Sequence, residues 1–242
     1  MMHDTIIDFQ TRPYPPPEPS VLGYQPVLSL IDGEVVAVKA VRPRAAHGSK
    51  RGIIAPSNRD RDMLHDGLME AHNWPAAVAI WLAFPGSELN NPDFPHELHT
   101  ALRRADIPAE RLTLKLPETT AMPINTDGLL SLAGLRDLGV GLVLTEFGGA
   151  IASLSMLRRL PLTAVALSPA VVGGLPEDRE DAALVRAAIS MAHVLGISVV
   201  ANGIATDAQR GWLAGLGCAA GIGPLFGAPM AAAKLGRWLR GD

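Results

Sequence analysis

The residues of this 242-residue chain that are best suited to chemistry stand near the ends of short apolar runs. Lys39 and Lys115 are two of them, Trp81 and Asn202 are two more, and Glu146 supplies a carboxylate. A divalent cation needs several hard oxygen ligands, usually with carboxylates among them, and two ammonium groups repel it. The same ammonium groups can contact phosphates as point charges. The set argues against a divalent-metal centre and leaves contact with an anion open.

Other reactive side chains show no recognisable arrangement. Cys218 is the single cysteine of the sequence, which excludes an intrachain disulfide and a cysteine-built zinc site. His96 and His99 have the helical spacing that can bind a metal, but no convincing third ligand accompanies them. We therefore expect neither a metal nor a cofactor at these positions.

The elements that must position the candidate residues follow an alternating strand and helix pattern. An antiparallel hairpin is predicted over 27–30 and 34–41, because Asp32-Gly33 lies between two runs rich in β-branched residues. Further strands are predicted over 77–83, 112–116, 140–145, 164–167 and 198–201, and helices over 94–105, 127–138, 151–157, 178–195, 207–216 and 231–239. Continuously apolar strands are typical of a parallel sheet that is buried on both faces. The pattern predicts an α/β fold, a TIM-like (β/α) barrel with an antiparallel first strand, and leaves a doubly wound open sheet as the alternative.

Several helix ends can be placed from single residues. Gly139 and Gly196 each follow a helical segment, where a left-handed C-cap favours glycine. Asp178 and Asp207 are predicted N-caps. The alternating charges from Arg59 to Asp62 are interpreted as a surface salt-bridge face.

Composition and charge limit the organisation and the partners. Residues 1–21 are interpreted as a proline-rich N-terminal tail, and 22–242 as the barrel domain. The net charge of −3 provides no basic field for nucleic acid. The sequence contains no apolar stretch that would span a membrane and no signal peptide, so we expect a cytoplasmic protein without a membrane partner.

Five fragments, in order, resemble the EAL domain, which is named for a Glu-Ala-Leu motif and whose active members hydrolyse the bacterial second messenger cyclic di-GMP. They are YQPVLSLIDGEVVAVKAV (24–41), GIIAP (52–56), GVGLVLTEFGGAIASL (139–154), VVANGIAT (199–206) and GCAAGIGPLFGAPM (217–230). The resemblance covers about residues 22–240 and implies an EAL-type barrel. It also implies, for active members, two Mg²⁺ or Mn²⁺ ions that activate a water for attack on a phosphodiester.

The departures from the family pattern concentrate on its chemistry. The family's metal-binding and water-positioning residues fall here on Lys39, Trp81, Lys115, Thr145, Glu146, Ala166, Asn202, Ala205 and Ile222. Glu146 is the one carboxylate that survives among the metal-binding positions. The arginine that grips a phosphate in the family falls on Pro43, although Arg42 and Arg44 flank it. The resemblance thus implies a kept scaffold with no catalytic residue, that is, a pseudoenzyme.

Three functions follow in order of preference. The first is a catalytically inactive EAL-like protein that acts in bacterial cyclic di-GMP-related signalling by binding a protein partner. The second is a metal-independent cyclic di-GMP receptor, and the third, less favoured, is an active phosphodiesterase. The candidate ligand-binding residues are Lys39, Arg42, Arg44, Trp81, Lys115, Glu146 and Asn202.

Two simpler interpretations remain beside these functions. In the first, Lys39 or Lys115 pairs with Glu146 or Glu118, and the ion pair closes the empty site. In the second, the basic residues after Val41 belong to a solvated connection between a strand and a helix. The segment 148–160 is apolar and suggests a homodimer, since Ile151 and Leu154 either form an interface or face the barrel.

Overall fold

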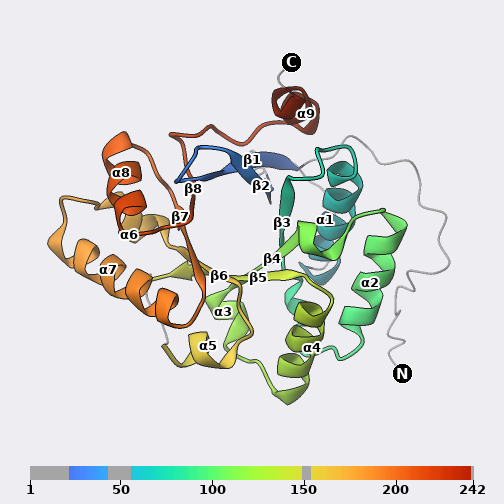
Figure 1. The fold of residues 1–242 in the computed structure, drawn as a ribbon. Coiled ribbons are helices and arrows are strands. Elements are labelled where there is room, and N and C mark those ends of the chain that lie inside the picture. The colour runs from blue at the N-terminus through green and yellow to red at the C-terminus, as the bar shows by residue number, and fades with distance from the viewer. Residues whose placement is uncertain (1–21, 43–55, 149–153, 241–242) are drawn as a thin grey trace.

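Eight strands close into a barrel in the computed structural model, which describes residues 22–42, 56–148 and 154–240 (Figure 1). β1 pairs antiparallel with both β2 and β8, and the other neighbouring strands are parallel. The predicted barrel with an antiparallel first strand is therefore confirmed, and the open sheet is wrong. The strands are β1 (Gly23–Ser29), β2 (Val35–Val41), β3 (Ala79–Ala83), β4 (Leu112–Pro117), β5 (Gly141–Phe147), β6 (Ala164–Leu167), β7 (Ser198–Asn202) and β8 (Ala220–Ile222).

Helices surround the barrel, and α9 lies beside β1 at the end of the chain (Figure 1). They are α1 (Pro56–Ala71), α2 (Phe94–Arg104), α3 (Glu118–Ala121), α4 (Thr126–Asp137), α5 (Leu154–Arg159), α6 (Pro169–Gly173), α7 (Arg179–Val194), α8 (Asp207–Gly215) and α9 (Ala232–Arg240), with short 3₁₀ turns η1 (Gly86–Glu88) and η2 (Ala109–Arg111). The sequence patterns did not predict α1, α3 or α6. In the described part of the chain, no helix is long and apolar enough to cross a membrane.

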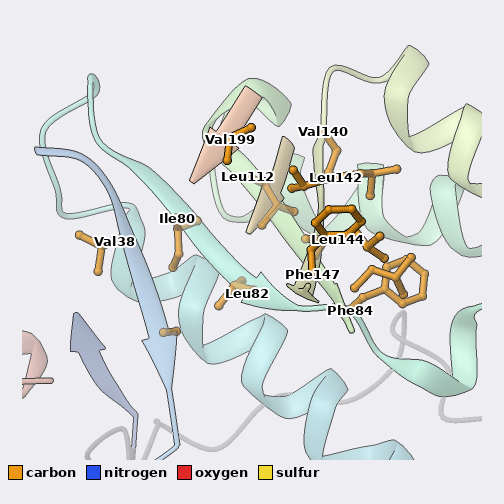
Figure 2. Close-up of a cluster of buried hydrophobic side chains, with 14 of the residues drawn as sticks. Val38, Ile80, Leu82, Phe84, Leu112, Val140, Leu142, Leu144, Phe147 and Val199 are labelled. Carbon is orange, nitrogen blue, oxygen red and sulfur yellow. The ribbon is translucent and has the colours of Figure 1, made fainter. Parts of the chain in front are cut away.

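Strand alternation divides the core into two layers. Residues on the outer face of the barrel, such as Val38, Ile80, Leu112 and Leu142, pack with side chains from the helices (Figure 2). Residues on the inner face form a separate apolar cluster inside the barrel, which we call the lumen cluster. It comprises Val27, Ala37, Trp81, Val143, Ala164, Ala166, Val200, Ala220 and Ile222. The barrel is thus a packed core and not a pore, as expected for this architecture.

The observed helix caps confirm some of the caps predicted from the sequence. Gly139 and Gly196 have φ of 97° and 69°, which confirms the left-handed conformation expected of them. The Asp178 side chain accepts hydrogen bonds from the amides of Glu180 and Asp181, so this N-cap is also confirmed. The prediction for Asp207 is wrong by one residue. Thr206 is the N-cap of α8, and it forms a reciprocal capping box with Gln209.

The charged run at the start of α1 also differs from its interpretation as a surface face. Arg61 is half-buried and forms ion pairs with Glu88 at 2.6 Å and Glu97 at 3.4 Å. Glu88 is only 4% exposed and also accepts hydrogen bonds from Ser87 and Asn91. Burial raises the pKa of Glu88, but the hydrogen bonds from Arg61 and Asn91 outweigh that effect and hold the pKa below its usual value. Arg61 therefore ties α1 to the β3–α2 connection.

Candidate functional site at the barrel mouth

Register brings the predicted strand-end residues together. Lys39 pairs with Trp81, Lys115 pairs with Val143 two residues before Thr145, and Asn202 pairs with Ile222. Paired residues of neighbouring parallel strands share a face, and Trp81, Val143 and Ile222 belong to the lumen cluster. We call this end of the barrel, formed by the carboxyl ends of the parallel strands, the barrel mouth. Lys39, Trp81, Lys115, Thr145 and Asn202 converge there from five strands.

Lys115 reaches across the mouth. Its Nζ donates a hydrogen bond to the carbonyl oxygen of Ala40 at 3.1 Å, so the side chain extends from β4 past β3 to β2. Burial, reinforced by the nearby charge of Lys39, lowers the pKa of Lys115 to about 7. Burial also lowers the pKa of Lys39. The two amines are close enough to repel each other when both are protonated.

The expected neutralisation of these lysines by a carboxylate is not found. Within the described part of the chain, neither Lys39 nor Lys115 forms an ion pair with a carboxylate. Glu118 is buried at the start of α3 and Glu146 is exposed, and no ion pair joins either of them to the two lysines. The mouth thus holds two amines without a counter-charge from the described part of the chain.

Trp81 fills part of the lumen beside Lys39. It is 8% exposed and packs in the lumen cluster with apolar residues that include Val143, Val200 and Ile222. Two hollows lined by described residues lie elsewhere, beside α1 and α2. The indole therefore occupies volume inside the barrel and is not presented on the surface.

Glu146 lies on an irregular part of β5. The pairing of β5 with β6 shifts between Leu144 and Phe147, and Glu146 has φ of 67°, a left-handed conformation that is uncommon for a residue with a side chain. Such a bulge redirects the side chains around it. Alternation along the strand does not by itself predict the exposed position of Glu146.

The remaining candidates have different surroundings. Arg42 is exposed immediately after β2, and Arg44 lies outside the described residues, as does Ile151 of the suggested dimer segment. Leu157 and Leu160 of that segment are buried against the body of the protein. Gln25 is a neighbour that the sequence did not single out. It pairs with Lys39 across the antiparallel strands and donates to the carbonyl oxygen of Gly227 at 3.0 Å.

The donor set at the mouth fits a divalent cation poorly. Glu146 supplies a carboxylate and Asn202 an amide, but two amines face the same space. Among the described residues, no group of three or more His, Cys, Asp or Glu side chains is placed to hold a metal ion. The metal pair that the family resemblance implies for active members therefore lacks matching ligands in this part of the chain.

Comparison with known proteins decides the family, because residues 20–229 match the EAL domain. The chain belongs to the EAL-domain family. It is 30% identical over 232 residues to MucR of Pseudomonas aeruginosa, a bifunctional diguanylate cyclase and cyclic di-GMP phosphodiesterase, and this similarity covers 89% of the chain and 34% of MucR. It is 31% identical over 238 residues to the cyclic di-GMP phosphodiesterase NbdA of the same organism, covering 90% of the chain and 30% of NbdA. The chain thus spans about a third of the length of these curated relatives.

Solved structures give the same fold. The MucR phosphodiesterase in complex with cyclic di-GMP is 27% identical, with a TM-score of 0.75 over 89% of this chain and 93% of that one. The manganese and cyclic di-GMP complex of Klebsiella pneumoniae BlrP1 is 22% identical, with a TM-score of 0.79 over 90% of this EAL domain and 57% of that chain. The second likeness concerns the fold alone.

Proposed function

We propose that this chain is an EAL domain that does not hydrolyse cyclic di-GMP and that acts in bacterial cyclic di-GMP signalling by binding a protein partner. The barrel mouth carries the proposal. Lys39 and Lys115 stand there together without a carboxylate partner among the described residues, where metal-dependent hydrolysis requires acidic ligands. The fold, in contrast, is that of relatives named as phosphodiesterases. A scaffold kept without its metal ligands supports a role in binding.

The decisive experiment measures cyclic di-GMP turnover with excess Mg²⁺ or Mn²⁺, with the MucR phosphodiesterase domain as the positive control. We expect no turnover above the no-protein blank. Turnover that Glu146→Ala abolishes would overturn the proposal, because it would show a working metal site. A repaired variant, Lys39→Glu with Lys115→Glu and Asn202→Glu, sharpens the test. If the absence of turnover results from missing metal ligands, calorimetry should detect Mn²⁺ binding to this variant and not to the parent chain.

The partner is sought with the intact chain as bait and the Lys39→Met, Lys115→Met double variant as a matched second bait. A partner that docks on the outside of the barrel should be retained by both baits. A chain that binds no protein reproducibly in cross-linking and size-exclusion experiments would contradict this half of the proposal.

A second candidate function, a metal-independent cyclic di-GMP receptor, rests on the same two amines. Lys39 and Lys115 supply positive charge at the end of the barrel where an anionic ligand enters this architecture. Trp81 weighs against it because the indole already occupies the lumen. Calorimetric titration with cyclic di-GMP in EDTA decides the matter. Binding that is lost in the Lys39→Met, Lys115→Met variant favours the receptor, and the absence of heat and thermal shift leaves the partner-binding function.

A further inference from the structure

The outer side of α2 carries a row of basic side chains. His96, His99 and Arg103 follow one another at intervals of three and four residues, which places them on one side of the helix over about 10 Å of its axis. Arg104 follows in the last turn, and all four side chains are exposed. Together with Thr100 they line a hollow on the protein surface. We call these five residues the basic face of α2.

The other sides of α2 are used by the fold. Phe94, Leu98 and Leu102 are buried in the hydrophobic core, and α2 lies in the helical layer beside α1 and α4 (Figure 1). Glu97 forms an ion pair with Arg61 of α1 at 3.4 Å, so this acidic side chain of α2 is turned towards α1. The basic face is therefore separate from the contacts that hold the helix in place.

The positive charge of the basic face is local. The whole chain has a net charge of −3, so composition alone does not account for basic side chains gathered on one helix. Within the described part of the chain, no carboxylate forms an ion pair with His96, His99 or Arg103. Asp93 precedes the helix and Asp106 follows it. A local excess of positive charge attracts a ligand that carries several negative charges.

The lining and the charge distribution favour an acidic peptide as this ligand. Pockets for small molecules are mostly apolar with a few polar groups, whereas every described residue that lines this hollow is polar or charged. A nucleic-acid surface is expected on a domain with a basic field, and this chain is acidic overall. Acidic side chains three and four residues apart on a helix repeat the spacing of the basic face.

We propose that the basic face of α2 is the docking surface for an acidic segment of a partner protein. Carboxylates of that segment accept hydrogen bonds from the guanidinium of Arg103 and from imidazole N–H groups of His96 and His99. This inference rests on the proposed function, because it names the surface through which the protein partner binds.

The first test titrates the full chain with a fluorescent alanine-based peptide of about 16 residues, long enough to form a helix, with glutamates three and four residues apart on one side. A matched peptide carries glutamine in place of each glutamate. We expect anisotropy to show about tenfold tighter binding of the glutamate peptide at low salt and weaker binding at high salt. Equal binding of the two peptides overturns the proposal. Tighter binding of a single-stranded oligonucleotide of equal charge also overturns it.

Charge reversal locates the site on α2. Arg103→Glu should weaken binding of the glutamate peptide by about fivefold or more. Arg179→Glu makes the same change at an exposed arginine of α7 and, as the matched control, should change the affinity by less than about twofold. The double variant His99→Glu, Arg103→Glu should bind a peptide with lysine at the glutamate positions more tightly than the parent chain does. Circular dichroism verifies folding, and folded variants that bind the glutamate peptide as the parent does would refute the assignment.

The same variants used as baits distinguish this inference from the proposed function. A partner captured by the parent chain should be lost from the Arg103→Glu bait and retained by the Arg179→Glu bait. A partner that the Arg103→Glu bait retains contradicts the docking surface and leaves the proposed function intact. A chain that captures no protein but still prefers the glutamate peptide contradicts the proposed function and supports the surface. A dimer of the parent chain that Arg103→Glu dissociates would overturn the inference, because the occupant would then be a second copy.

Discussion

The pKa of Lys115 has a direct consequence for stability that a single substitution exposes. The folded state lowers this pKa from 10.5 to about 7, so between these values the unfolded chain binds more protons than the native protein. Stability therefore rises with pH across that window. Below pH 7 both states are protonated and the native state bears the full penalty, on the order of 5 kcal/mol at 1.36 kcal/mol per pKa unit.

Lys115→Met removes this penalty with a side chain of similar length. The variant also loses the hydrogen bond to the Ala40 carbonyl oxygen, which is worth about 1 kcal/mol. We expect the variant to be more stable than the parent by about 3–4 kcal/mol at pH 6. The advantage should shrink by about 2–3 kcal/mol at pH 9, because part of the penalty has then disappeared from the parent chain.

The assay is urea unfolding of both proteins in buffers from pH 6 to pH 9. Burial raises the pKa of Cys218 to about 12, which weakens the folded state at alkaline pH, but this effect is common to both chains and cancels in their difference. Lys234→Met is the exposed control and should match the parent throughout. A difference between Lys115→Met and parent that stays constant with pH, or a destabilised variant at pH 6, would refute the reasoning.

Three further substitutions or treatments test other parts of the structure. Arg61→Met leaves the buried carboxylate of Glu88 without its guanidinium and should cost about 3 kcal/mol at pH 7 in urea unfolding. That cost should fade as pH drops below the ordinary carboxyl pKa of about 4.3, whereas a pH-independent cost would point to lost packing. Gly203→Ala forces a side chain onto a residue with φ of 99°, with its Cβ 2.9 Å from Pro169 Cβ, and should cost about 1–3 kcal/mol in thermal unfolding. Gly211→Ala in α8, where a Cβ meets nothing within 4 Å, is its control and should stabilise by roughly 0.5–1 kcal/mol. Cys218 should resist iodoacetamide at pH 8 in the native protein and react in urea, and rapid native alkylation would contradict its burial.

Local patterns predicted the barrel because they repeat along the chain. The alternation in β4 places Leu112, Leu114 and Leu116 on one face and Lys115 on the other, as the structure shows. Parallel register then places Lys39 and Trp81 near Lys115, so the convergence at the mouth follows once the barrel is assumed. These features depend on strand period and strand order, both of which are readable in the sequence.

Other features depend on partners far away in the sequence. Arg61 is half-buried because it forms an ion pair with Glu88, 27 residues later in the sequence. No residue within α1 indicates that this carboxylate will lie nearby. Glu146 takes a left-handed conformation within a bulge, which strand alternation does not encode. Ala40 receives the Lys115 ammonium through its backbone oxygen, a contact that no residue type at position 40 would reveal.

The charge of the barrel mouth depends on its two lysines. Carboxylates around cations balance their charges, but Lys39 and Lys115 have no such balance within the described residues. Trp81 packs inside the lumen next to Lys39, and burial lowers the pKa values of both amines. The net charge of the mouth then varies near neutral pH, because the pKa of Lys115 is about 7. An anion that reaches the mouth is attracted more strongly when Lys115 is protonated, so anion binding at this end of the barrel should weaken as the pH rises through about 7, even without a metal.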